Sequence, residues 1–287
     1  EAAFGNGVVY LEKMIIGARH IEIQLLADAH GNAIHLGERE CSLQRRHQKL
    51  TEETPSPFMT DKLRDEMGKA AVKAAEYIKY EGAGTVEFLV DKHRNFYFME
   101  MNTRIQVEHP VTELITGIDL VEQMIRVAAG EPLGIAQNKV RLQGWAVESR
   151  IYAEDPYRNF LPSIGRLKRF LPPKEGKLSG GTVRMDSGVR EGDEISMFYD
   201  PMIAKLIVHG ATREIALKRM DRALATTEVA GSVTNLAFLR RLVATPPCAL
   251  EQADASELVA AGWQFPERFV AKGRDGVTDI YGIIHRP

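Results

Sequence analysis

The stretch FYFMEMNTRIQVEHPVT, residues 96–112, places polar side chains at alternate positions over a long run. Successive side chains of an extended chain point to opposite faces, so alternate residues of this run would share one face. That face would carry Glu100, Asn102, Arg104, Gln106 and Glu108. The opposite face would carry Met99, Met101, Thr103, Ile105 and Val107, which suits a buried surface. The run therefore predicts a strand that packs on one side and presents a chemical site on the other.

A neighbouring strand brings another carboxylate to this site. In the strand expected over 84–90, residues 86–90 are apolar apart from Glu87, and the polar linker at 91–94 is short enough for an antiparallel hairpin with residues 95–101. The hairpin would bring Glu87 near Glu100. Half-buried carboxylates repel one another unless a cation lies between them, and oxygen ligands suit Mg²⁺ or Mn²⁺. A solvated strand face explains any single Glu, but five polar groups in register favour a metal site.

Arg104 and Glu108 suggest a second chemistry beside the metal. A fixed guanidinium can hold a carboxylate-like anion such as bicarbonate, or stabilise a developing oxyanion. A carboxylate four residues further on can accept a proton as a general base. A plain ion pair between the two residues is the alternative.

The basic run from Gln44 to Lys49 is a weaker signal. Adjacent cations with amide groups can line a phosphate or bicarbonate pocket, although such a run alone is more often a solvated loop. His20 and the pair Glu12–Lys13 are individually weak signals as well.

Periodicity predicts the other elements of the chain. Strands are expected over 8–16, 20–28, 33–36 and 145–153, with several short strands between 164 and 209. Helices are expected over 60–80, with Thr60 as the N-cap, and over 119–129, 212–225 and 233–244. The pattern changes near Trp145 and near Pro246, where domains are expected to meet.

The bulk composition excludes some classes of function. A net charge of −2 gives no global field for nucleic acid, and no apolar run is long enough to span a membrane. Two cysteines in 287 residues are no disulfide framework and fit a reducing compartment, the cytoplasm or the mitochondrial matrix. The chain does not start with Met and is expected to begin inside a longer protein.

Five segments carry a resemblance to a known family. They are RHIEIQ at 19–24, ERECSLQRRHQK at 38–49, GAGTVEFL at 82–89, FMEMNTRIQVEHPVTE at 98–113 and YDPMIAKL at 199–206. These segments closely resemble biotin carboxylases. The segments GWAVESRIYAEDP at 144–156, LPSIGRL at 161–167 and YDPMIAKL are most similar to those of acyl-CoA carboxylases such as the propionyl-CoA carboxylase type. The resemblance implies an α+β chain: a partial ATP-grasp domain over 1–144, then the biotin carboxylase C-terminal domain over 145–247.

The resemblance also implies roles for matching residues. The divalent metals, and through them the ATP phosphates, would be held by Glu87, Glu100 and Asn102. The rest of ATP would contact Glu12, Lys13, His20, Gln44, His47 and Leu89. Bicarbonate would be held by Lys49, Arg104, Gln106 and the backbone of Val107. Glu108 would deprotonate bicarbonate, Arg104 would also stabilise the biotin enolate, and Arg150 would contact the ureido oxygen of biotin.

The implied reaction is the ATP- and bicarbonate-dependent carboxylation of biotin through carboxyphosphate. The cofactors would be ATP, Mg²⁺ or Mn²⁺, and biotin on a carrier domain that this chain does not contain. The partners would be that biotin carboxyl carrier domain and a carboxyltransferase subunit, within a homo-oligomer, without nucleic acid or membrane. Which acyl-CoA is used belongs to the carboxyltransferase.

The sequence departs from the family in three places. Ser149 replaces the Cys usual before the biotin-contacting Arg. The family's N-terminal domain, glycine-rich lid and two ATP-binding lysines would precede this chain, so the chain alone is expected to have little or no activity. Residues 248–287 resemble a segment of prolyl oligopeptidase-family enzymes instead, which suggests a chimera or a variable extension. The alternatives are another ATP-grasp ligase and a non-catalytic nucleotide-binding or assembly fragment.

Overall fold

The computed structural model describes residues 14–178, 180–244, 267–272 and 279–284. The chain divides into two compact units, of which residues 19–246 form the larger. The described part of the smaller unit contains an antiparallel strand pair, β16 (Glu267–Lys272) with β17 (Asp279–Ile284). The origin predicted for the tail at 248–287 stays a prediction.

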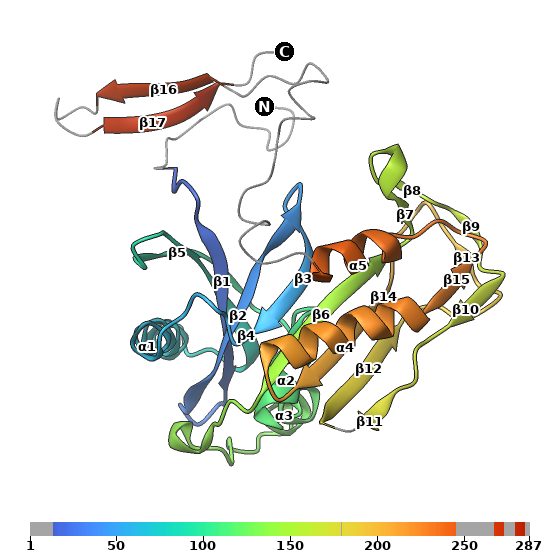
Figure 1. The fold of residues 1–287 in the computed structure, drawn as a ribbon. Helices are drawn as coiled ribbons and strands as arrows, with labels where there is room; N and C mark the ends of the chain where they lie inside the picture. Colours follow the sequence, from blue (N-terminus) through green and yellow to red (C-terminus); the bar gives the residue numbers. More distant parts are fainter. Residues whose placement is uncertain (1–13, 179, 245–266, 273–278, 285–287) are drawn as a thin grey trace. The chain divides into compact units, whose positions relative to one another are not determined.

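One antiparallel sheet of nine strands organises the larger unit, in the order β11-β12-β14-β6-β3-β2-β1-β4-β5 (Figure 1). Its first-half strands are β1 (Arg19–Ala27), β2 (Ala33–Arg45), β3 (Gln48–Thr54), β4 (Gly82–Val90) and β5 (Phe96–Asn102). Its second-half strands are β6 (Trp145–Tyr152), β11 (Gly176–Leu178), β12 (Gly181–Ser187) and β14 (Met202–Gly210). The sheet runs on across residue 145, and the predicted domain boundary there stays a prediction.

Short strands and five helices complete the described residues of this unit. The helices are α1 (Asp61–Tyr77), α2 (His109–Thr116), α3 (Leu120–Ala128), α4 (Arg213–Thr226) and α5 (Leu236–Ala244), with 3-10 turns η1 (Gln137–Lys139) and η2 (Pro156–Arg158). The short strands are β7 (Glu154–Asp155), β8 (Leu161–Pro162), β9 (Gly165–Arg166), β10 (Arg169–Leu171), β13 (Glu194–Ile195) and β15 (Glu228–Ala230). None of these helices has the length and apolar composition needed to cross a membrane.

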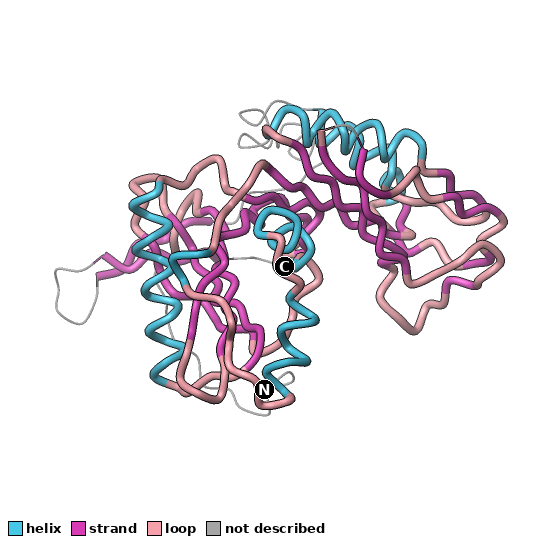
Figure 2. The backbone as a smooth tube through the Cα atoms, turned by 90° about the horizontal axis from the view of Figure 1, so that it is seen from below, coloured by secondary structure: helices cyan, strands magenta, loops and turns pink. Residues whose placement is uncertain are grey.

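Alternation along β1 gives the sheet two different faces. Ile21, Ile23 and Leu25 point to an apolar face, where they pack with α1. In the second half of the sheet the same face packs with α4 and α5. Helices therefore flank the strands on both sides, as Figure 2 shows, because the other face is covered by α2 and α3.

Most predicted elements are confirmed. The helix at 60–80 is α1, and the Thr60 hydroxyl accepts from the backbone N–H of Leu63, as an N-cap does. The strand predicted over 8–16 lies partly outside the described residues, and residues 14–16 are not in a strand. The helix α2 was not predicted.

Candidate active site

The second face of the sheet, here called the polar face, gathers charged side chains from four adjacent strands. In the strand register Glu22 lies opposite both Arg39 and Glu87, and Glu87 lies opposite Glu100. Cross-strand partners leave the same face, so the two carboxylates expected to meet do so. Asn102 joins them, because its Nδ2 donates to Glu87 Oε1 at 2.8 Å and to Glu100 Oε1 at 3.2 Å.

The long face predicted from the 96–112 run is wrong beyond Asn102. The strand β5 ends there, and Glu108 is the N-cap residue of α2. The opposite face is also less buried than expected, since β5 is an edge strand and Met99 is 40% exposed. The turn nevertheless returns Gln106 to the cluster, where its Nε2 donates to Glu87 Oε1 at 2.6 Å.

Lys49 lies at the centre of three carboxylates. Its Nζ is 2.5 Å from Glu108 Oε1, 2.7 Å from Glu22 Oε2 and 3.4 Å from Glu87 Oε1. Burial alone would lower the pKa of Lys49, but the facing Cys41 and the carboxylates raise the pKa well above its ordinary value. Lys49 is therefore a fixed positive charge.

Two of the carboxylates around Lys49, those of Glu22 and Glu87, are held ionised. Burial acts to raise the pKa of Glu22, but the charges of Arg39 and Lys49 outweigh it and lower that pKa to about 2. Burial likewise opposes ionisation of Glu87, while a hydrogen bond from His20 and the charge of Lys49 lower its pKa to about 2. Specific cations and hydrogen bonds thus offset the desolvation penalty of these two buried negative charges.

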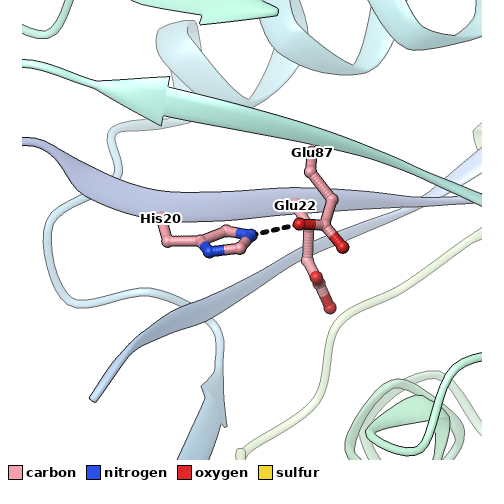
Figure 3. Close-up of side chains that lie close together, drawn as sticks. All are labelled: His20, Glu22 and Glu87. Atoms are coloured by element: carbon pink, nitrogen blue, oxygen red, sulfur yellow. Dashed lines mark ion pairs between the residues drawn. The ribbon is translucent and has the colours of Figure 1, made fainter. Parts of the chain in front are cut away.

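His20 links the carboxylates to the β2–β3 hairpin. Its Nε2 lies 2.5 Å from Glu87 Oε2, next to Glu22, as Figure 3 shows. Gln44 Nε2 lies 2.8 Å from His20 Nδ1 and 2.8 Å from the carbonyl of Cys41. Gln44 therefore holds one ring nitrogen of His20 while the other faces Glu87.

Arg39, which was not predicted, organises the floor of the site. Its side chain is fully buried, and its donors bond five acceptors. These acceptors are Glu22, Gln24, Thr85, Gln106 and Thr112, at 2.5 to 3.1 Å. A guanidinium has five N–H groups, so this one is saturated. Because Gln106 Oε1 accepts from Arg39, the Nε2 of Gln106 is turned toward Glu87. The polar residues at every second position of β1 were the sequence signal that a buried cation such as Arg39 lies beside that strand.

Arg150 closes the far side of the cluster. Its Nη2 donates to Glu108 Oε2 at 2.9 Å, and its Nε donates to Glu52 Oε1 at 2.6 Å. Burial would lower the pKa of Arg150, but Glu52 and Glu108 raise it. Glu108 therefore pairs with Lys49 through one carboxylate oxygen and with Arg150 through the other. Lys205 Nζ donates to the Val107 carbonyl at 2.5 Å and fixes that peptide next to Glu108.

The other predicted site residues lie around this cluster. Arg104 is exposed and donates to Asn102 Oδ1 at 3.3 Å, so it lies next to the paired carboxylates. Leu89 is half-buried opposite His20, and His47 is exposed in the turn between β2 and β3. The basic run is therefore a hairpin rather than a loop. Glu12 and Lys13 lie outside the described residues.

Comparison with known proteins identifies the family. Residues 1–136 match the ATP binding domain of the carbamoyl-phosphate synthase L chain, and residues 148–258 match the biotin carboxylase C-terminal domain. The propionyl-CoA carboxylase alpha chain of Ruegeria pomeroyi is 58% identical over 85% of this chain and 38% of its own length. The biotin carboxylase of a Nostoc species is 54% identical over 85% of this chain and 54% of its own length. The chain belongs to the biotin carboxylase family.

Solved biotin carboxylases share the fold. The biotin carboxylase domain of Hydrogenobacter thermophilus 2-oxoglutarate carboxylase, in complex with MgADP, ADP and bicarbonate, is 46% identical with a TM-score of 0.82. The match covers 91% of this chain and 56% of that domain. The biotin carboxylase subunit of pyruvate carboxylase is 44% identical with a TM-score of 0.81, over 92% and 58%. The predicted α+β fold of ATP-grasp type is confirmed. The chain spans about a third to a half of the length of its curated relatives.

Proposed function

We propose that this chain supplies the metal, bicarbonate and biotin contacts of an ATP-dependent biotin carboxylase. The observation that carries the proposal is the grip of Lys49 and Arg150 on Glu108, beside the paired carboxylates Glu87 and Glu100. A carboxylate fixed between two cations has a defined direction in which to accept a proton. The relative solved with MgADP and bicarbonate supports the same ligands here.

The residues present fit a divalent metal. Glu87, Glu100 and Asn102 offer oxygen atoms only, from two carboxylates and an amide on neighbouring strands. Such a set suits Mg²⁺ or Mn²⁺ better than it suits softer metals. When held by these residues, the cation would neutralise the negative charge of phosphate. Release of Asn102 Nδ2 from the two carboxylates would free the oxygens that it now contacts.

The nucleotide would lie along the end of the polar face. His20 and Leu89 are side by side in the register, and Gln44 bonds His20. These residues, with His47 and with Glu12 and Lys13 upstream, would contact the base, ribose or phosphates of ATP.

Bicarbonate chemistry would follow at Glu108. Lys49, Arg104, Gln106 and the Val107 backbone would hold bicarbonate while Glu108 takes its proton. The bicarbonate oxygen would then bond the γ-phosphorus, releasing ADP and forming carboxyphosphate. Carboxyphosphate would split into CO₂ and phosphate, and the phosphate would take the N1 proton of biotin. Arg150, with Arg104, would stabilise the enolate that captures CO₂.

A carrier domain for biotin and a carboxyltransferase, in a homo-oligomer, are the proposed partners. Since the chain spans a third to a half of its relatives, we propose that alone it binds ligands without efficient turnover. A nucleotide-binding fragment without catalysis is therefore the second candidate, and both candidates predict that the chain alone binds nucleotide.

Calorimetry with the full chain tests the site directly. MgADP should bind, and Glu100→Gln should weaken MgADP about tenfold while leaving metal-free ADP unchanged, because one metal ligand is lost. Glu66→Gln, on an exposed turn of α1, is the matched control. Equal binding of MgADP by wild type and Glu100→Gln would refute the metal assignment. Biotin-dependent ATP hydrolysis at the rate of an intact carboxylase would refute the expected lack of turnover.

A further inference from the structure

Two buried acids face each other beneath Arg150. Glu52 of β3 and Glu148 of β6 are direct cross-strand partners, so their Cβ atoms lie about 4.5–5.5 Å apart on the polar face. Both side chains are 0% exposed. The apolar side of α2 covers this part of the face, where Val111 and Ile115 pack on Ala146.

Three of their four oxygens lack a partner. Glu52 Oε1 accepts from Arg150 Nε at 2.6 Å. Glu52 Oε2 and both oxygens of Glu148 have no hydrogen-bond donor within the described part of the chain. Two ionised carboxylates at adjacent buried positions would repel strongly, and unpaired buried oxygens are costly. A proton on one of the two acids removes one negative charge and converts one acceptor into a donor that can pair with an oxygen of the other residue.

The proton belongs on Glu148. Glu52 has an ion-pair partner in Arg150, whereas Glu148 has none among the described residues. The charged groups facing Glu148 are Glu52 on β3, Arg150 on β6, Lys205 on β14 and Glu108 at the start of α2. Lys205 is engaged by the Val107 carbonyl and by Asp186.

The pKa shifts agree with this assignment. Burial, followed by the charge of Glu52, raises the pKa of Glu148 well above its ordinary value. Burial also raises the pKa of Glu52, to about 7, against the opposing charge of Arg150. The two acids therefore titrate as a pair, and burial favours the protonated form of each.

We propose that Glu148 is a protonated carboxylic acid that donates a hydrogen bond to Glu52 and thereby positions Arg150. The order of contacts would be Glu148 to Glu52, Glu52 to Arg150, and Arg150 to Glu108. Glu148 is a positioning residue, since it reaches the substrates only through other side chains. Its importance for catalysis rests on the proposed function, whereas its protonation and its hold on Arg150 do not.

Infrared difference spectra of the full chain test the proton. At pH 7, subtracting Glu148→Gln from wild type should leave the C=O stretch of one protonated carboxylic acid. The control Glu66→Gln, an exposed glutamate of α1, should leave carboxylate bands instead. Glu148→Asp should shift the acid band rather than abolish it, and serves if the amide variant does not fold. Loss of carboxylate bands in Glu148→Gln would overturn the proposal.

Nitrogen NMR tests the positioning. The Nε–H resonance of Arg150, assigned by its disappearance in Arg150→Lys, should persist in Glu148→Gln, because an amide also donates to Glu52. The resonance should shift or broaden in Glu148→Leu, which has no donor. An unchanged resonance in Glu148→Leu would show that Glu52 holds Arg150 unaided, and the positioning role would fall. Neither experiment depends on turnover, so failure here is distinct from failure of the proposed function.

Discussion

Replacing Arg39 by Met should show how strongly this site depends on one buried cation. Arg39 is fully buried, and its Nε lies 2.5 Å from Glu22 Oε1, a carboxylate that is itself 0% exposed. Removing one partner of a buried ion pair costs about 3–5 kcal/mol. The amide and hydroxyl acceptors also lose donors, at about 1 kcal/mol for each one that cannot find another. We expect a loss of about 5 kcal/mol, which rivals the whole stability of many domains.

The assay is urea unfolding of the full chain followed by circular dichroism. The double variant Arg39→Met with Glu22→Gln should be more stable than Arg39→Met alone, by about 2 kcal/mol, because no uncompensated charge is left buried. Arg126→Met is the matched control, since Arg126 is half exposed and pairs with Glu122 on α3. It should leave the urea midpoint nearly unchanged, because an exposed ion pair contributes little to stability. A double variant less stable than the single one would refute the reasoning.

Three further predictions concern charge and packing. Glu22 and Glu87 have folded-state pKa values of about 2, so the stability that they provide is present above pH about 4.5 and lost as pH falls toward 2. In Glu87→Gln the free energy of unfolding should fall less over that pH range than in the wild type, by up to about 3 kcal/mol. An equal fall in both proteins would contradict this. Lys49→Met should destabilise the chain more at pH 8 than at pH 5, because at pH 5 protons can bind the carboxylates that lost their cation. A difference in urea midpoint between wild type and Lys49→Met that is the same at both pH values would contradict it. Gly68→Ala should destabilise α1 by about 1–2 kcal/mol despite better helix propensity, because the added Cβ would lie 2.5 Å from the His35 ring; a higher melting temperature would disprove it.

Local patterns were enough to predict most of the fold. The 60–80 helix has a capping residue and an apolar stripe, and the 84–101 hairpin has a short polar linker, so each element is specified by neighbours in sequence. The helix α2 was missed because the 96–112 run was treated as extended throughout. Pro110 in its first turn was the signal that the strand had ended and a helix had begun.

The site divides in the same way. Glu87 and Glu100 were predicted to meet because a hairpin joins their strands. Arg39 and the Glu52–Glu148 pair were not, because they depend on which distant strands are neighbours. The pairing of β3 with β6 joins segments on either side of residue 100, and no local pattern specifies that register. The positions of Arg39 and of the Glu52–Glu148 pair therefore depend on the topology of the sheet, whereas the meeting of Glu87 with Glu100 follows from local sequence.

The charges of the cluster agree with both the proposed metal and the proposed proton. The connected acids are Glu22, Glu52, Glu87, Glu108 and Glu148, and the cations bonded to them are Arg39, Lys49 and Arg150, while Lys205 also faces Glu148. The proposed proton on Glu148 would remove one negative charge where α2 covers the face. Glu100 is exposed at the other end of the cluster, where the proposed divalent cation would bind. Burial thus decides which imbalance is met by a proton and which is left for a ligand.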